Sequence, residues 1–521
     1  MKKIFTLCVL QLITGLALAQ PGSLDSTFSS DGKLIVPVGS ADDYGKSIGV
    51  QSDGKVLVAG YSSTGSGYDF SLLRFNSDGT ADNSFGSSGV AITDFGGSTD
   101  RGEALLIQAD GKIVVVGKGM STFTDDPAAY DFALVRYNAN GTLDNTFGTG
   151  GKVLTDLDSA SSDYGYAAAL QSDGKILVTG SRDIASAIDF TLVRYNTDGT
   201  LDPGFGSGGK VFVDYGGTRD IAYSVKVQSD GKIVIAGLSS NSGTYDFALA
   251  RFNSDGSPDN SFDGDGKLLA DLGGMYDYAT SISVQSDGKI VAAGQSHNGV
   301  DYDFAIARFN SNGTLDNTFD ADGKLNISFG TGTSEGIASV LVQPDGKILV
   351  GGHSSGGSAG GDDFALMRFN ADGSLDNSFD GDGKVLTDFG GTLNSEYINS
   401  IALQPDGKIV AVGDKGQNFS STSFVWDIAI ARYNVAALSA GVTEADPGME
   451  PEVYPNPSSG IFQIAGNYTG SVKMEIYNSI GEKIKEATGR QFDLSAEQAG
   501  IYFVKMVCGD KVVVRKIVLG R

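Results

Sequence analysis

Seven carboxylates occupy one repeated position in the sequence, eight residues before a Gln that opens a Gln-x-Asp-Gly-Lys block. Carboxylate oxygens are ligands that Ca²⁺ prefers in proteins. If the segment after each acid lines a central channel, the seven side chains ring one channel mouth and attract a cation such as Ca²⁺. The interpretation we favour is that each acid caps a backbone turn or pairs with a neighbouring unit, because short acids are common in turns. The seven residues are Asp43, Asp100, Asp163, Asp220, Asp277, Glu335 and Glu396.

Variable segments between the repeated blocks carry aromatic and imidazole side chains that suit ligand binding. They are rich in Ser, Gly, Asn and Tyr, and they connect the second and third expected strands of each unit. A rigid scaffold that presents diverse loops is a common way to build a binding surface. The candidate ligand-binding residues in these loops are Phe123, His297, Phe419 and Trp426.

Residues suited to catalysis are scarce. The two histidines, His297 and His353, stand in no Ser or Cys motif that would form a nucleophile pair. The sequence has no zinc-ligand spacing and no phosphate-binding loop of the Gly-Lys-Ser type. Paired carboxylates could serve a glycosidase, but acids are so numerous that their pairing carries no information. We therefore name no catalytic residue, and Ca²⁺ is the one cofactor considered.

The elements that must position these residues follow from an internal repeat. Each unit has an alternating run before the Gln-x-Asp-Gly-Lys turn, an apolar run after it, a run like DFALARFN, and a short run after a block like LDNSF. Asp-Gly favours a tight hairpin turn, so each unit predicts four antiparallel strands. Seven such units predict a β-propeller. The blocks begin at Gln51, Gln108, Gln171, Gln228, Gln285, Gln343 and Gln404.

The phase of the repeat predicts that the N-terminus closes the ring. An LDSTF block and a strand at Lys33–Val38 come before any Gln-x-Asp-Gly-Lys block, and the last unit stops at Asn434 without an LDxSF block. The first fragment therefore supplies what the last unit lacks, which removes exposed sheet edges. The expected fold is all-β, with a seven-bladed propeller of four-stranded blades over residues 20–434.

Residues that recur in every unit are expected to build the fold. The Phe of the LDxSF block, for example Phe85, is expected to pack between blades. The Arg of the third strand, for example Arg74, is in phase with buried positions and needs a partner there. The Asp of the LDxSF block, Asp82 in this unit, is the candidate for that ion pair.

The repeated text resembles a known family. The segments FNSDGTADNSFG, QSDGKILVTG and DFALVRYN are similar to the delta-60 repeat family of bacterial β-propellers, and the resemblance covers about residues 24–434. It implies the propeller fold with seven repeats. It implies no activity, because a propeller hosts binding and several chemistries.

The charge and the N-terminal segment restrict location and partners. The 521-residue chain has 38 Lys and Arg against 63 Asp and Glu, a net charge of −25. This balance argues against nucleic acid or an anionic membrane as partner, because proteins bind both of these largely through Lys and Arg side chains. Residues 1–19 have a charged start, an apolar run and an Ala-Leu-Ala end, which predict a signal peptide. No later segment approaches the length of a transmembrane span, and Cys508 alone remains, so no disulfide framework is expected.

The chain changes character after residue 434. Residues 435–452 have little pattern and are expected to form a linker, whereas residues 453–521 contain alternating runs typical of strands. The blocks YPNPSSGIF, IYN, GIYFV and KIV resemble the type A C-terminal sorting domain of the Bacteroidetes type IX secretion system. This resemblance implies a small β-sandwich recognised by the outer-membrane export machinery. The residues that carry it are Tyr454, Pro455, Asn456, Pro457, Gly460, Gly500, Tyr502 and Lys516.

Taken together, these features predict a monomer that is secreted or held at the outer-membrane cell surface. The leading hypothesis is that the propeller is a binding or adhesion module for a glycan or a protein. The alternatives are a polysaccharide-degrading enzyme and a structural surface component. Turnover of a polysaccharide would favour the enzyme, and retention without turnover would favour the binding module.

Overall fold

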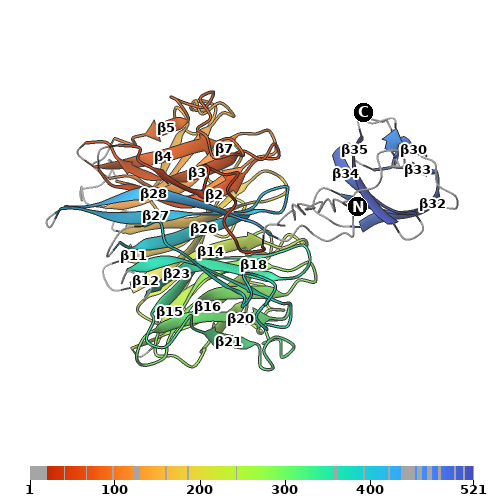
Figure 1. Ribbon diagram of the computed structural model, residues 1–521. Coiled ribbons are helices and arrows are strands. Elements are labelled where there is room, and N and C mark those ends of the chain that lie inside the picture. Colours follow the sequence, from red (N-terminus) through yellow and green to blue (C-terminus); the bar gives the residue numbers. More distant parts are fainter. Residues whose placement is uncertain are drawn as a thin grey trace, which may run out of the picture. The chain divides into compact units, whose positions relative to one another are not determined.

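Every regular element that the computed structural model of the protein describes is a β-strand, as the sequence predicts (Figure 1). The chain divides into two units, residues 1–435 and residues 436–521. The structure describes residues 20–519, except residues 40, 66, 97–98, 121–128, 159–160, 185–186, 242, 356–360, 391–393, 421–422, 436–451, 455–459, 466–471, 479–482, 498–499 and 509–510. The predicted signal peptide and nearly all of the predicted linker therefore lie outside the described residues.

The first unit contains seven four-stranded antiparallel sheets, which are the blades of a seven-bladed propeller. Within blades 1 to 6 the strands pair in chain order from the innermost to the outermost. Blade 1 contains β2 (Asp43–Val50), β3 (Val56–Ser63), β4 (Tyr68–Phe75) and β5 (Val90–Thr93), and blade 2 contains β6 (Arg101–Ile107), β7 (Ile113–Met120), β8 (Tyr130–Tyr137) and β9 (Lys152–Thr155). Blade 3 contains β10 (Ser162–Leu170), β11 (Ile176–Ile184), β12 (Ala187–Tyr195) and β13 (Lys210–Val213), and blade 4 contains β14 (Asp220–Val227), β15 (Ile233–Asn241), β16 (Thr244–Phe252) and β17 (Lys267–Ala270). Blade 5 contains β18 (Asp277–Val284), β19 (Ile290–His297), β20 (Tyr302–Phe309) and β21 (Lys324–Ile327), and blade 6 contains β22 (Glu335–Val342), β23 (Ile348–Ser355), β24 (Asp362–Phe369) and β25 (Lys384–Thr387).

Blade 7 joins the two ends of the propeller sequence. It consists of β26 (Glu396–Leu403), β27 (Ile409–Ser420), β28 (Ser423–Tyr433) and the N-terminal strand β1 (Lys33–Val36). Strand β1 runs antiparallel to β28, with Lys33 opposite Ala431. The predicted closure of the ring by the N-terminal strand is therefore confirmed.

Glycines set the turns at the end of the blades opposite the acids. In blade 4 the turn before β15 contains Gly231 at φ +84°, which lets its N–H bond to the carbonyl oxygen of Gln228 at 2.9 Å. Gly256, at φ +87°, lies under the ring of Phe205 from blade 3, and a Cβ atom there would come within 2.9 Å of that ring. Gly256 thus serves both the turn and the contact between two blades.

Every blade has an anchor cluster, which we define as the third-strand Arg, the Asp of the LDxSF block and the Lys of the Gln-x-Asp-Gly-Lys block. In blade 3 the Asp202 carboxylate lies 2.8 Å from Arg194 and 2.9 Å from Lys175. The Arg194 guanidinium also donates to the backbone oxygen of Ser254 in the next blade. The predicted Arg–Asp ion pair is confirmed in all seven blades. The pairs are Arg74–Asp82, Arg136–Asp144, Arg194–Asp202, Arg251–Asp259, Arg308–Asp316, Arg368–Asp376 and Arg432–Asp25.

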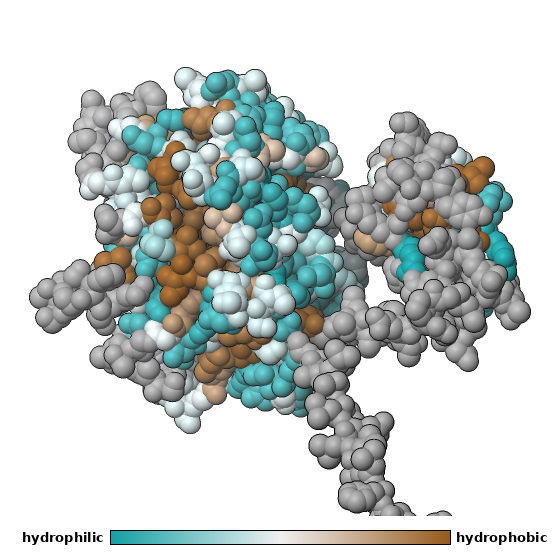
Figure 2. All heavy atoms as spheres, turned by 45° about the horizontal axis from the view of Figure 1, so that its top comes forward, coloured by the Kyte–Doolittle hydropathy of each residue, from teal (hydrophilic) through white to brown (hydrophobic). Residues whose placement is uncertain are grey.

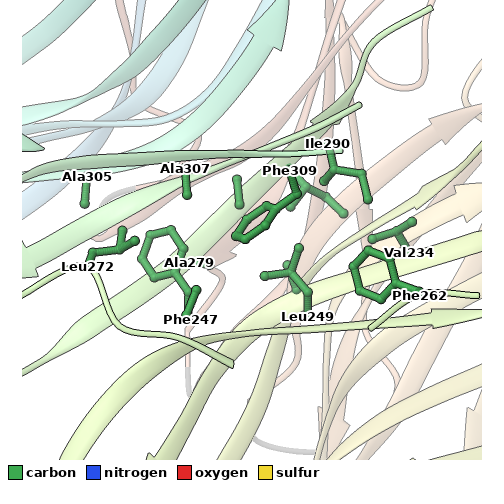
Figure 3. Close-up of a cluster of buried hydrophobic side chains, with 14 residues drawn as sticks. Val234, Phe247, Leu249, Phe262, Leu272, Ala279, Ile290, Ala305, Ala307 and Phe309 are labelled. Atoms are coloured by element: carbon green, nitrogen blue, oxygen red, sulfur yellow. The ribbon is translucent and has the colours of Figure 1, made fainter. Parts of the chain in front are cut away.

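Apolar side chains fill the space between neighbouring blades (Figure 3). Phe262, from the LDxSF block of blade 4, is fully buried and shares a cluster with Val234 and Leu249 of its own blade and Ile290 and Phe309 of blade 5. Burying an aromatic ring of this size contributes about 2–3 kcal/mol. The predicted role of these Phe residues between blades is confirmed.

The outermost strands leave some apolar side chains in contact with solvent. Ile92, Phe212, Leu269 and Leu386 are each between 38% and 45% exposed. Figure 2 shows hydrophobic surface as separate patches among polar regions of the propeller. Scattered exposed apolar residues of this kind are normal on a protein surface.

The second unit is a small β-sandwich, as the sequence predicts. One sheet contains β29 (Glu452–Tyr454), β30 (Ile461–Ala465) and β33 (Gln491–Asp493), and the other has the order β32 (Lys483–Gly489), β31 (Val472–Asn478), β34 (Gly500–Cys508), β35 (Lys511–Leu519). Phe462 and Ile464 of the first sheet share one buried cluster with Met474, Val504 and Ile517 of the second.

Candidate functional site

The innermost strand of every blade contains a β-bulge at the same position. In blade 4 the pairing of β14 with β15 shifts between Ala222 and Ser224, which leaves Tyr223 as the extra residue. A bulge re-aims the side chain that it carries, and bulges are common beside functional sites. The seven bulge residues are Lys46, Glu103, Tyr166, Tyr223, Thr280, Ala338 and Asn399.

A cavity of 450 Å³ lies where the seven innermost strands meet. All seven bulge residues line it, and all are half-buried. Gln295, His353 and Asp414, from the second strands of blades 5, 6 and 7, complete its polar lining. Each of the seven blades therefore contributes a side chain to the cavity, at a position whose residue type varies between the repeat units.

Four aromatic rings, those of Tyr166, Tyr223, His353 and Tyr397, line the cavity, and further rings contact one another at the end of the blades where the innermost strands begin. We call them the aromatic belt; all are half-buried except Tyr61, which is buried. Tyr166 and Tyr223 of neighbouring blades have ring centroids 5.3 Å apart, and Tyr397 and Trp426 have centroids 5.6 Å apart. The belt consists of Tyr44, Tyr61, Tyr68, Tyr130, Tyr164, Tyr166, Tyr223, Tyr245, Tyr276, Tyr278, His297, Tyr302, His353, Tyr397 and Trp426.

Charged groups inside the cavity are partly matched. Lys46 forms a salt bridge with Asp414 at 2.8 Å, and Asn399 donates a hydrogen bond to the same carboxylate at 2.7 Å. Burial raises the pKa of Glu103 and lowers the pKa of His353. The cavity thus favours a neutral imidazole at His353, which has one donor and one acceptor nitrogen.

The seven repeated acids are buried in separate junctions between blades, with 0 or 1% of each residue exposed. They do not line an open channel mouth. Asp43, for example, accepts backbone N–H bonds from Val38 at 2.7 Å and Gly39 at 3.1 Å, in the loop that leads into its strand. Asp100, Asp163, Asp220, Asp277 and Glu335 accept an equivalent N–H bond. The favoured interpretation, a cap on a backbone turn, therefore describes these six acids, while Glu396 has Lys415 at 3.9 Å.

Four of these acids meet two further carboxylates. In the junction between blades 4 and 5, oxygen atoms of Asp246, Asp271 and Asp277 lie within 4.8 Å of one another. The same arrangement recurs at Asp69, Asp94 and Asp100, at Asp131, Asp156 and Asp163, and at Asp363, Asp388 and Glu396. Burial, followed by neighbouring carboxylates, raises the pKa of Asp163 to about 7. Cation binding at the repeated acids, with Ca²⁺ as the candidate, stays a prediction.

The predicted ligand-binding residues are placed unequally. Trp426 and His297 belong to the aromatic belt, since Trp426 stacks on Tyr44 at 6.1 Å and His297 contacts Tyr302 at 4.8 Å. Phe123 and the side chain of Phe419 lie outside the described residues. Among the predicted sorting residues, Tyr502 is 7% exposed in the sandwich core, Gly500 begins β34, and Gly460 has φ +154°. Pro455, Asn456 and Pro457, and the side chains of Tyr454 and Lys516, lie outside the described residues.

Sequence reasoning missed the bulge residues. The sequence does contain a signal for them, because the third residue after each repeated acid differs widely between units whose neighbouring positions repeat. A position that varies on a repeated scaffold is where a binding site is expected.

Two families match the chain. The family described as a domain of unknown function (DUF5122) beta-propeller matches six segments, residues 51–85, 108–147, 171–205, 228–262, 285–319 and 343–379. The seventh unit and the delta-60 name are not part of this match; blade 7 takes its LDxSF block from the N-terminus, so it lacks a continuous copy of the repeat. The secretion system C-terminal sorting domain matches residues 452–520.

Solved structures resemble the chain at low identity, and no curated protein matches it. The extracellular domain of the putative hybrid two-component system BT3049 from B. thetaiotaomicron is 10% identical, with a TM-score of 0.39; the match covers 94% of this chain and 57% of that chain. The polysaccharide lyase Uly1 is 13% identical, with a TM-score of 0.45, over 80% of this chain and 98% of that one. Sqt1 from Chaetomium thermophilum is 11% identical, with a TM-score of 0.40, over 78% and 97%. None of these scores supports a transfer of function.

The sorting domain determines where the protein is located. It directs export through the type IX secretion system to the cell surface or the extracellular space, so the secretion machinery is a partner. Among the described residues, no helix combines the length and the apolar character needed to cross a membrane. The chain thus contains a DUF5122 β-propeller domain and ends in a type IX secretion system sorting domain.

Proposed function

We propose that the propeller is an exported binding module for a glycan chain, with the central cavity and the aromatic belt as its site. The observation that carries the proposal is the group of half-buried rings in the wall of a polar cavity, which includes Tyr166, Tyr223 and Tyr397. Aromatic side chains offer flat apolar faces with polar tips, and binding cavities add a few convergent polar groups that fix orientation. A saccharide unit has apolar C–H faces and a rim of hydroxyls, so it matches both features.

A protein partner is the other ligand that the sequence left open. A stable protein interface usually covers about 800 Å² on each partner and relies on a well-packed apolar centre. The varied residues here are gathered instead in one concave cavity of 450 Å³. A cavity of this shape suits single saccharide units of a glycan chain better than the surface of a protein partner.

A polysaccharide-degrading enzyme is the second candidate. The observation that favours it is His353, whose pKa is lowered by burial and whose ring contacts Tyr397 at 4.8 Å in the wall of the cavity. A neutral imidazole beside a phenol is a plausible pair for proton transfer. Burial raises the pKa of Tyr397 to about 12, so its hydroxyl keeps its proton at neutral pH.

The test is retention of the full chain on immobilised polysaccharides, with release of soluble products followed in the same samples. Retention without product supports the binding module, and product formation that is lost in His353→Ala supports the enzyme. The variant Tyr166→Ala/Tyr223→Ala removes two neighbouring rings of the cavity and should lower affinity by about tenfold or more, on the scale of roughly 1 kcal/mol per aromatic contact.

The matched control is Phe212→Ala, which removes an exposed aromatic ring from the outermost strand β13. This variant should bind like the unmodified chain. Equal losses in Phe212→Ala and in the double variant would place binding outside the cavity. Absence of retention on every polysaccharide would overturn the glycan proposal and leave the structural surface component.

A further inference from the structure

Two cations lie side by side in blade 2, at the end of the blades where the innermost strands begin; we call this end of the propeller the channel end. Arg101 of β6 pairs directly with Lys118 of β7 in the antiparallel register, so their side chains share one face. The Arg101 guanidinium lies 5.1 Å from the ring centroid of Tyr61 and 5.4 Å from that of Tyr68. The Lys118 ammonium lies 4.5 Å from the centroid of Tyr164. The aromatic belt therefore flanks the pair on both sides.

Neither cation has a carboxylate in salt-bridge contact within the described part of the chain, and the buried Nε of Arg101 has no hydrogen-bond partner there. Two other cations at this end of the blades are paired: Lys46 lies 2.8 Å from Asp414, and Arg182 lies 2.6 Å from Asp189. In a chain with a net charge of −25, it is unusual for two adjacent cations to lack a carboxylate in salt-bridge contact.

The local charge favours an anion. Glu103, the bulge residue of the same strand, interacts with Arg101, Lys118 and Lys46, and Lys46 is already matched by Asp414. One carboxylate thus faces two cations that lack their own partners. Burial lowers the pKa of Lys118, which means that its ammonium has lost water without gaining full compensation. A bound anion would supply that compensation.

We infer that the Arg101–Lys118 pair binds the anionic group of an acidic saccharide unit whose ring rests on the aromatic belt, the unit bearing either a carboxylate or a sulfate. This inference rests on the glycan-binding function proposed above and names its ligand class. Arginine is suited to the role, because its planar guanidinium holds a carboxylate or sulfate through two parallel N–H bonds while it stacks on aromatic rings. The lysine adds a point charge on the other side of the anion.

The experiment measures the affinity of the full chain for matched polysaccharides by titration calorimetry. Polygalacturonate is compared with its methyl ester, which removes the charge and keeps the backbone, and dextran sulfate is compared with dextran. We expect each anionic polymer to bind at least tenfold more tightly than its neutral counterpart. The carboxylate pair and the sulfate pair show which of the two anions the site prefers.

The variant Arg101→Gln/Lys118→Gln should remove this preference and leave the affinity for the neutral polymers unchanged. The charge control is Arg219→Gln, which removes an exposed cation just before β14 at the same end of the blades. It should change affinity by less than twofold. Thermal unfolding of all variants verifies that each is folded.

The outcomes separate the two proposals. Equal binding of charged and neutral polymers, or equal losses in Arg219→Gln and in the double variant, would overturn the role of the Arg101–Lys118 pair while glycan binding stands. Absence of binding to all four polymers would overturn glycan binding itself, and this inference with it.

Discussion

The two ends of the same seven blades follow opposite rules. At one end every blade has an anchor cluster with the same Arg, Asp and Lys in the same contacts, as in Arg194, Asp202 and Lys175. At the other end the side chain at the bulge of the innermost strand varies between blades, from Lys46 to Ala338, with six residue types in seven blades, and all seven line the cavity. The bulges at one end and the glycine turns at the other both recur from blade to blade, so the difference between the ends lies in which side chains recur.

This comparison separates residues that hold the ring of blades together from residues that are available to bind a ligand. A contact copied in all blades joins neighbours and contributes to each interface, as expected in a repeat protein. A position that changes from blade to blade contributes little to the shared packing and is free to fit an asymmetric ligand. The five predictions below test this division, and the substitution at an anchor cluster has the largest expected effect.

Replacing Arg194 by Ala should destabilise the propeller by about 3–5 kcal/mol, because it removes one partner of a buried ion pair. Arg194 is 6% exposed and also donates to Ser254 of the next blade. Urea unfolding followed by the fluorescence of Trp426, the single tryptophan, measures the loss. Arg219→Ala, at an exposed site, should cost less than about 0.5 kcal/mol. Similar costs for the two variants would contradict the division between the ends.

The buried acids at the channel end should make the protein less stable as pH rises. Asp163 has its pKa raised to about 7, first by burial and then by Asp131 and Asp156. In the unfolded chain it ionises near pH 4, so between about pH 4 and pH 7 the unfolded state releases a proton that the folded state keeps, and stability falls with rising pH. Asp163→Asn should therefore be more stable than the unmodified chain at pH 8, by roughly 4 kcal/mol, and similar to it at pH 4.

Asp202 of the anchor end supplies the opposite case. A hydrogen bond from Lys175 lowers the pKa of Asp202 to about 2, so its contribution is present above about pH 4 and is lost as pH falls through 2. Asp202→Asn should thus be less stable than the unmodified chain at pH 7, where Asp163→Asn is not. Urea unfolding at pH 4, 7 and 8 measures both variants. If the unfolding free energy of Asp163→Asn depended on pH in the same way as that of the unmodified chain, the raised pKa of Asp163 would be contradicted.

The anchor end could be predicted from the sequence, and most of the channel end could not. Arg74 and Asp82 stand in every unit at fixed spacing, so charge and burial alone paired them, and the LDSTF block placed Asp25 beside Arg432. The bulge at Tyr223 is a matter of register between two strands, and one sequence does not show which residue its partner strand skips. The burial of the repeated acids depends on which loop N–H groups face them, which likewise appears only in the folded chain.

Replacing Tyr223 by Ala should weaken glycan binding by about tenfold, equivalent to 1.4 kcal/mol, and change the unfolding free energy by less. The side chain is half-buried in the cavity and contacts Tyr166 of the neighbouring blade at 5.3 Å. Tyr223→Phe keeps the ring and serves as the control, with affinity within about threefold of the unmodified chain. If Tyr223→Ala instead unfolded the protein and left the affinity of the folded fraction unchanged, the bulge residues would belong to the scaffold.

The junctions between blades give a comparison inside the channel end. Between blades 6 and 7, three carboxylates share their site with Lys415, whose ammonium lies 3.9 Å from Glu396 and donates to the backbone oxygen of Phe389. Between blades 4 and 5, three equivalent carboxylates have no salt bridge within the described residues, and Lys324 donates to the backbone oxygen of Asp271 rather than to its side chain. One junction thus contains its own cation, whereas the other depends on protonation or on a cation from solution.

The smallest expected effect is that Ca²⁺ raises the melting temperature at pH 7.5, by about 2–4 °C at a concentration well above its dissociation constant. The increase should be smaller in Asp271→Asn, which removes a carboxylate from one of the three carboxylate junctions that have no lysine salt bridge within the described residues. It should persist in Asp388→Asn, because Lys415 already balances the charge there. Differential scanning calorimetry with Ca²⁺ and with EDTA measures the difference. An unchanged melting temperature would mean that protons alone relieve the carboxylates and that the repeated acids serve only to cap turns. The same increase in Asp271→Asn would place the Ca²⁺ effect outside this junction.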